Sequence, residues 1–112
     1  MAIQHASSGQ VIDVRPFGSR LLSEKTTALF KSEQLEVIRL VLQAGKSFPE
    51  HSVAGEITVQ CLEGQLDFTA EGKSHLLNAG EMLFLARGVP HEVTAIQDSS
   101  ALMTIVLSVQ SR

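Results

Sequence analysis

Two histidines, His51 and His91, are the side chains of this chain best placed to do chemistry. His51 follows the segment Gly-Lys-Ser-Phe-Pro-Glu, and His91 follows Arg-Gly-Val-Pro, so each comes directly after a turn-forming stretch. An imidazole titrates near neutral pH and is a common ligand of transition metals. The pair can therefore act as metal ligands, as an acid/base pair, or as polar points held by backbone hydrogen bonds in an otherwise apolar pocket.

The other reactive side chains are weaker candidates. His5 lies in a polar N-terminal segment and His75 on a predicted hairpin strand, and both are interpreted as surface residues. Cys61 is the single cysteine and has apolar neighbours, so we interpret it as a small core residue. One cysteine excludes an internal disulfide framework and a metal-thiolate cluster.

The elements that must position the two histidines are short strands. The chain has 112 residues, enough for one core, and glycines and prolines interrupt it at short intervals. No long segment keeps a helical period, and only 18–25 is expected to form a helical turn. The all-β pattern predicts strands over 11–17, 26–32, 35–43, 56–62, 65–70, 74–77, 82–86, 91–96 and 102–109.

Charge and hydropathy exclude several classes of partner. The net charge is −3 and no basic run occurs, which argues against nucleic acid as a partner. No apolar stretch reaches the roughly 18 residues of a membrane span. The N-terminal segment lacks the features of a secretory signal, so we expect a cytoplasmic protein that does not bind membranes.

The turns around the two histidines resemble the motifs of the cupin superfamily. Gly45, His51 and Gly64 stand at the spacing of the first cupin motif. Gly80, Gly88 and His91 stand at the spacing of the second motif, and the resemblance spans roughly 35–109. It implies a single-domain, all-β fold: a double-stranded antiparallel β-barrel of the cupin type, jelly-roll-like. In that family, two histidines and a glutamate of the first motif and a histidine of the second usually bind a divalent metal.

The chain departs from the cupin pattern at two of these ligand positions. Val53 occupies the second histidine position and Ile57 the glutamate position. Glu56 is adjacent to Ile57, but strand alternation points it to the opposite face unless a bulge turns it inward. The cofactor prediction is therefore either no metal or one Fe, Mn, Ni or Zn ion held by His51 and His91, with Glu56, Glu50 or solvent completing the coordination shell.

The barrel interior is expected to form a mostly apolar cavity. Its predicted lining is Phe48, His51, Val53, Ile57, Val59, Phe68, Phe84, His91, Val93 and Met103. Such a pocket suits a small organic molecule with an apolar body and one or two hydrogen-bonding groups. The leading hypothesis is a small-molecule-binding protein with an incomplete metal site. The alternatives are a metal-dependent dioxygenase, isomerase or lyase acting on a small organic acid, and an interaction module.

Several predicted strands are apolar on both faces, notably 37–42, 82–85 and 105–107. A half-exposed sheet should alternate, so something must cover the outer face. A second copy of the chain in a homodimer is the expected cover, and residues 1–33 are the other candidate. We accordingly divide the chain into an N-terminal region, 1–33, which packs on the barrel or on a partner subunit, and a barrel, 34–112.

Overall fold

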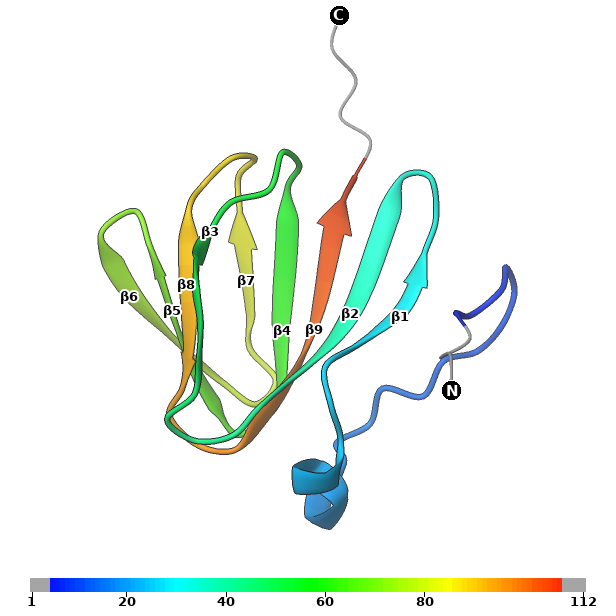
Figure 1. The fold of residues 1–112 in the computed structure, drawn as a ribbon, viewed down its shortest axis with the longest axis horizontal. Coiled ribbons are helices and arrows are strands. Elements are labelled where there is room, and N and C mark those ends of the chain that lie inside the picture. Colours follow the sequence, from blue (N-terminus) through cyan, green and yellow to red (C-terminus); the bar gives the residue numbers. More distant parts are fainter. Residues whose placement is uncertain (1–4, 108–112) are drawn as a thin grey trace, which may run out of the picture.

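Two antiparallel β-sheets, packed against each other, make up most of the computed structural model, which describes residues 5–107 (Figure 1). The elements are η1, a 3₁₀ helix (Gly18–Ser23), and the strands β1 (Thr27–Lys31), β2 (Leu35–Leu42), β3 (Ser47–His51), β4 (Ile57–Glu63), β5 (Gln65–Ala70), β6 (Lys73–Asn78), β7 (Met82–Leu85), β8 (His91–Ala95) and β9 (Ser99–Val106). One sheet has the order β1-β2-β9-β4-β7 and the other β3-β8-β5-β6. The predicted all-β fold and the helical turn after residue 17 are confirmed.

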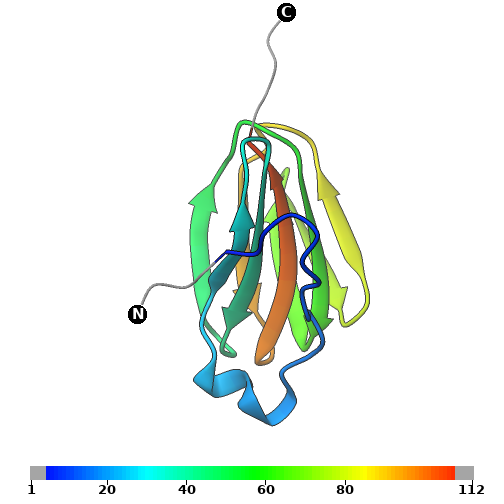
Figure 2. The ribbon, with the colours of Figure 1, turned by 90° about the vertical axis from the view of Figure 1, so that its right-hand side faces the viewer.

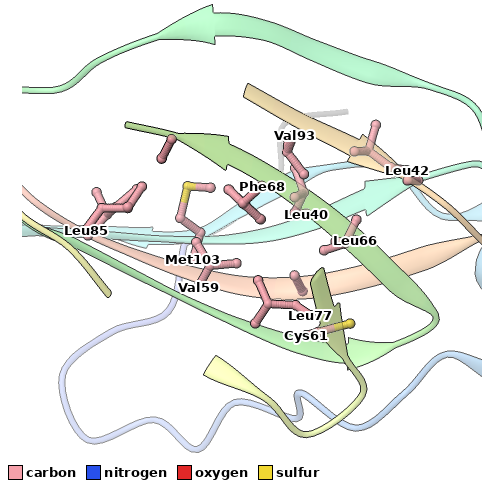
Figure 3. Close-up of a cluster of buried hydrophobic side chains, with 14 of the residues drawn as sticks. Leu40, Leu42, Val59, Cys61, Leu66, Phe68, Leu77, Leu85, Val93 and Met103 are labelled. Carbon is pink, nitrogen blue, oxygen red and sulfur yellow. The ribbon is translucent and has the colours of Figure 1, made fainter. Parts of the chain in front are cut away.

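The hydrophobic core lies between the two sheets, where alternate residues of each strand meet. On β2, Leu40 and Leu42 are buried in this core, while their neighbours Arg39 and Val41 belong to the other face. Figure 3 shows the central side chains of the cluster, contributed by both sheets. The tight β4–β5 connection depends on Gly64, whose φ is +83° and where a Cβ would lie 2.2 Å from the Asp98 carbonyl oxygen.

One predicted strand does not form, one observed strand was not predicted, and one predicted strand is displaced. Residues 11–17 form no strand, because this segment is attached by side chains rather than by a backbone ladder. β3 was not predicted because it contains Pro49, which an edge strand tolerates and a central strand does not. β9 begins at Ser99, before the predicted start at 102, and residues 108–109 of that prediction lie outside the described residues.

The first part of the N-terminal arm (residues 5–26) runs along the outer side of the five-stranded sheet of its own chain, and η1 lies beyond the lower ends of the strands (Figure 2). The Ala6 backbone N–H donates to the Leu29 carbonyl oxygen of β1. Further along, the Phe17 ring lies over the Arg39 guanidinium, whose central carbon is 3.9 Å from the ring centroid. The arm thus covers part of the apolar outer face. Among residues 5–107 we find no helix that is long and apolar enough to cross a membrane.

Glu63, at the end of β4, fastens this arm to the sheet. Its carboxylate accepts hydrogen bonds from the backbone N–H groups of Phe17 and Gly18, at 2.9 and 3.0 Å, and from the Ser100 hydroxyl. Arg39, only 3% exposed, places Nη2 3.5 Å from the same carboxylate. Burial raises the pKa of Glu63, but these hydrogen bonds and the Arg39 charge outweigh burial, so the pKa lies below its ordinary value.

The homodimer remains a prediction. The surface that it would use is the outer face of β7, which the N-terminal arm leaves uncovered. Met82 and Phe84 on that face are 61% and 58% exposed. If two copies pair through this face by two-fold symmetry, a charged residue in place of Phe84 is buried in both halves of the interface and should prevent the pairing. We therefore expect the wild-type chain to sediment as a dimer and Phe84→Asp as a monomer. A wild-type chain that sediments as a monomer would contradict this expectation.

Candidate functional site

The fold brings His51 and His91 together, although 40 positions separate them in the chain. His51 ends β3, His91 begins β8, and the two residues are directly opposite each other in the antiparallel pair. Cross-strand partners share one face of a sheet. The ring centroids lie 4.4 Å apart and the ring planes are inclined by 58°. The predicted convergence of the two imidazoles is therefore seen in the structure.

Both imidazoles are held by the same kind of hydrogen bond. Nδ1 of His51 lies 3.1 Å from the Pro49 carbonyl oxygen, and Nδ1 of His91 lies 3.1 Å from the Val89 carbonyl oxygen. A carbonyl oxygen can only accept, so each Nδ1 carries the proton. In the neutral ring, Nε2 is then left with a lone pair and no proton.

Among residues 5–107, two buried side-chain nitrogens have no hydrogen-bond partner: Nε of Arg39 on the outer face of β2, and Nε2 of His91 beside the pair. His91 itself is 1% exposed. A buried acceptor left unsatisfied costs about 1–3 kcal/mol. Buried polar groups in folded proteins are nearly always hydrogen-bonded. The position thus calls for a hydrogen-bond donor or a cation.

A pocket of about 300 Å³ adjoins His51. It lies between the inner face of β2 and β9 and the end of β3, and its lining is Thr26, Ile38, Leu40, Phe48, Pro49, His51, Met103 and Ile105. The Thr26 hydroxyl is already engaged with the backbone of Val41. His51 is consequently the principal free polar group on an apolar wall.

The predicted lining is met in part. Phe48, His51 and Met103 line the pocket, as expected. His91 was also predicted to line it but is buried behind the lining, with its ring centroid 4.4 Å from that of His51. Four other predicted residues have buried side chains that belong to the hydrophobic core: Ile57, Val59, Phe68 and Val93. Figure 3 shows Val59, Phe68 and Val93 within this core. Val53 is half-buried and packs against that core.

Phe84 was wrongly placed in the pocket. It is directly opposite Thr58 of β4, whereas its neighbour Leu85 is opposite the buried Ile57. Phe84 therefore shares the outer face of the sheet with Thr58. Because residues 82–85 are all apolar, the sequence pattern did not distinguish the two faces.

Five lining residues were missed: Thr26, Ile38, Leu40, Pro49 and Ile105. Ile38 and Leu40 lie in a run that is apolar at nearly every position, so alternation alone did not identify the inner face. Pro49 was missed together with β3. The motif glycine Gly45, six residues before His51, was the available signal that this segment approaches the site.

The donor set around the histidines does not fit the metal that the cupin resemblance implies. Glu56 is exposed just before β4, and Ile57 points inward, so no bulge turns Glu56 toward the pair. Within residues 5–107, no group of three or more His, Cys, Asp and Glu side chains is placed to hold a metal ion. A catalytic transition metal needs three or four protein ligands. Two imidazoles do not supply them, since Val53 and Ile57 stand at the other two ligand positions of the motif.

The remaining candidates take no part in this site. The Cys61 thiol is buried and lies 3.4 Å from the Glu63 carbonyl oxygen, and burial raises its pKa. It is the core residue that its neighbours predicted. His5 is exposed, and His75 on β6 is half-buried with Nδ1 3.1 Å from the Phe68 carbonyl oxygen.

Comparison with known proteins agrees with this fold. The family model described as "Cupin domain" matches residues 38–108, which is more than half of the chain. No curated protein sequence matches significantly.

Solved structures resemble the chain over most of its length. A conserved protein of unknown function from Streptococcus pyogenes is 19% identical, with a TM-score of 0.75 over 98% of this chain and 97% of that one. A cupin superfamily protein from Desulfitobacterium hafniense is 17% identical, with a TM-score of 0.75 over 88% and 95%. An RmlC-like cupin from Desulfovibrio desulfuricans is 25% identical, with a TM-score of 0.67 over 91% and 97%. At such identities, similarity supports the fold and not an activity.

Proposed function

Since this chain belongs to the cupin domain family, we propose that it uses the cupin fold to bind a small organic molecule in the pocket beside His51, with no resident metal. The pocket combines apolar walls from β2, β3 and β9 with one imidazole pair. Small-molecule sites have this composition: a hydrophobic lining and a few placed polar groups. The observation that carries the proposal is the buried, unpartnered Nε2 of His91 next to this pocket.

The size of the pocket limits its ligand. A volume of about 300 Å³ is at the lower end of the range for small-molecule sites, so it suits one ring with a short substituent. Burying such an apolar body contributes about 25 cal/mol per Å² of surface removed from water. The pocket therefore supplies most of the binding energy, and the histidine pair orients the ligand.

Metal-dependent catalysis is the weaker candidate for this site. It needs a third protein donor, and Glu56 is turned to solvent while Ile57 fills the position of the family glutamate. An apolar surround also raises the free energy of placing a dication there. The donor set thus favours binding of an organic molecule over binding of a metal.

Thermal unfolding with 4-ethylphenol and cyclohexanol as probes tests the proposal. A ligand at ten times its dissociation constant stabilises the folded state by about 1.4 kcal/mol. For a chain of this size the melting temperature should then rise by about 5 °C. We expect at least one probe to produce a saturable rise.

Two variants at neighbouring positions localise the binding. Ile38→Phe places extra volume in the pocket, whereas Val37→Phe places it on the opposite face of β2. The first should abolish the rise in melting temperature and the second should retain it. A rise that survives Ile38→Phe would mean that binding occurs elsewhere and would refute this pocket as the site.

A further inference from the structure

Resting on the proposed function, the geometry points to a narrower ligand class: we infer that the pocket selects neutral molecules that carry a hydroxyl or N–H donor on an apolar body. The donor is accepted by the unprotonated Nε2 atoms of the His51–His91 pair. Anionic ligands, including carboxylates, are disfavoured. This inference concerns the polar end of the ligand, which the shape of the pocket alone does not determine.

The two backbone carbonyl groups determine that the histidine pair accepts a hydrogen bond from the ligand and does not donate one. Because the Pro49 and Val89 carbonyl oxygens accept from Nδ1, both neutral rings present an acceptor at Nε2. At His91 this acceptor is buried and unpartnered. At His51 the ring forms part of the pocket wall. A ligand hydroxyl or N–H satisfies such an acceptor, whereas an ether oxygen or a carboxylate does not.

The charges near the pocket also disfavour an anion. None of the described lining residues is lysine or arginine. Arg39 is buried on β2, but it is on the face opposite Leu40 and is engaged by Glu63 and by the Arg15 carbonyl oxygen. A carboxylate in this pocket would lose water without gaining a counter-charge.

Three probes of nearly the same shape test the inference: 4-ethylphenol, 4-ethylanisole and 4-ethylbenzoate. The first carries a donor, the second has the donor methylated, and the third is an anion at pH 8. Isothermal titration with the full chain should give a dissociation constant for the phenol about tenfold lower than for the ether. The benzoate should show no binding at concentrations that saturate the phenol site.

Variants of the pair identify the acceptor. His51→Leu and His91→Leu each remove one Nε2, so the phenol-to-ether ratio of dissociation constants should move toward one while the ether still binds. His75→Leu is the matched control, because its imidazole also has Nδ1 near a carbonyl oxygen but lies on β6, at the opposite edge of the sheet from β3 and His51. This control should keep the wild-type ratio.

The possible results separate the inference from the function on which it rests. Ether or benzoate binding as tight as phenol binding would overturn the inference and leave the pocket proposal standing. An unchanged ratio in both histidine variants would also overturn it. If none of the three probes nor cyclohexanol binds, the proposed function itself is wrong.

Discussion

The double variant Val53→His with Ile57→Glu is expected to bind about one transition-metal ion per chain, whereas under the proposed function the wild-type chain should bind none. Both substitutions restore the donor types that the cupin motif has at these positions. Ile57 is directly opposite Ile105, which lines the pocket with His51. Val53 is linked to the segment that precedes His91, since its carbonyl oxygen accepts a hydrogen bond from the Gly88 N–H at 3.0 Å. The variant thus offers three imidazoles and one carboxylate, a complete donor set.

The expected gain in metal affinity is large because two ligands become four. We expect a dissociation constant for Zn(II) or Mn(II) lower by on the order of a hundredfold or more. Without metal the variant should be less stable than wild type, because the carboxylate introduced at position 57 would be a buried charge without a partner. Added metal should therefore raise its melting temperature, and elemental analysis after desalting should find about one ion per chain.

Two single variants are the controls for this prediction. Val53→His adds a donor to a half-buried position, and Ile57→Glu adds one at a buried position, so each should bind metal more weakly than the double variant. Near-stoichiometric metal in the wild-type protein would contradict the metal-free pocket. A double variant that folds and yet holds no metal would show that positions 53 and 57 do not face the histidine pair.

Replacing Glu63 by alanine is expected to lower the free energy of unfolding by about 3–5 kcal/mol. The substitution leaves the buried Arg39 charge without its carboxylate partner. It also removes the acceptor for the Phe17 and Gly18 N–H groups, which attach the N-terminal arm. Denaturant unfolding measures the loss. Trypsin cleavage at Arg20 should become faster, since this residue lies in the released segment.

Two further variants separate charge from shape in this network. Glu63→Gln keeps the side-chain volume and an acceptor but removes the charge, so it should lose less stability than Glu63→Ala. Arg39→Met combined with Glu63→Leu removes both charges and should recover part of the loss. A Glu63→Ala variant within about 0.5 kcal/mol of wild type would refute the assigned role of the carboxylate.

The same carboxylate makes stability depend on pH. The pKa of Glu63 is lower in the folded chain than in the unfolded chain, where it is about 4.3. Its contribution is therefore fully present above that value and is lost as pH falls through the lower, folded-state pKa. The stability difference between wild type and Glu63→Gln should be constant near neutral pH and shrink below about pH 4.3.

The sequence predicted those features that depend on local spacing. Turn residues located most strands, and the interval from Gly45 to His51 and from Gly80 to His91 predicted that the two imidazoles meet. Alternation between the two faces predicted that Glu56 would point away from the pair unless a bulge turned it inward, and in the structure Glu56 is exposed.

Other features depend on contacts that no local pattern records. The attachment of Phe17 to Glu63 spans 46 positions and uses backbone N–H groups, which every non-proline residue has. Phe84 was assigned to the wrong face of its strand, and Ile38 was left out of the pocket lining. Both errors have the same cause, because these strands carry apolar residues on both faces. β3 was overlooked because its edge position, which accommodates Pro49, is a property of the tertiary fold.

The protonation of the two imidazoles is the most direct test of the binding site. Long-range ¹H–¹⁵N correlation spectra of ¹⁵N-labelled protein at pH 8 report, for each histidine ring, which nitrogen carries the proton. The structure predicts a protonated Nδ1 and an unprotonated Nε2 for both His51 and His91. A proton on Nε2 of either ring, with Nδ1 unprotonated, would contradict the account, because the site would then present a donor to its ligand and not an acceptor.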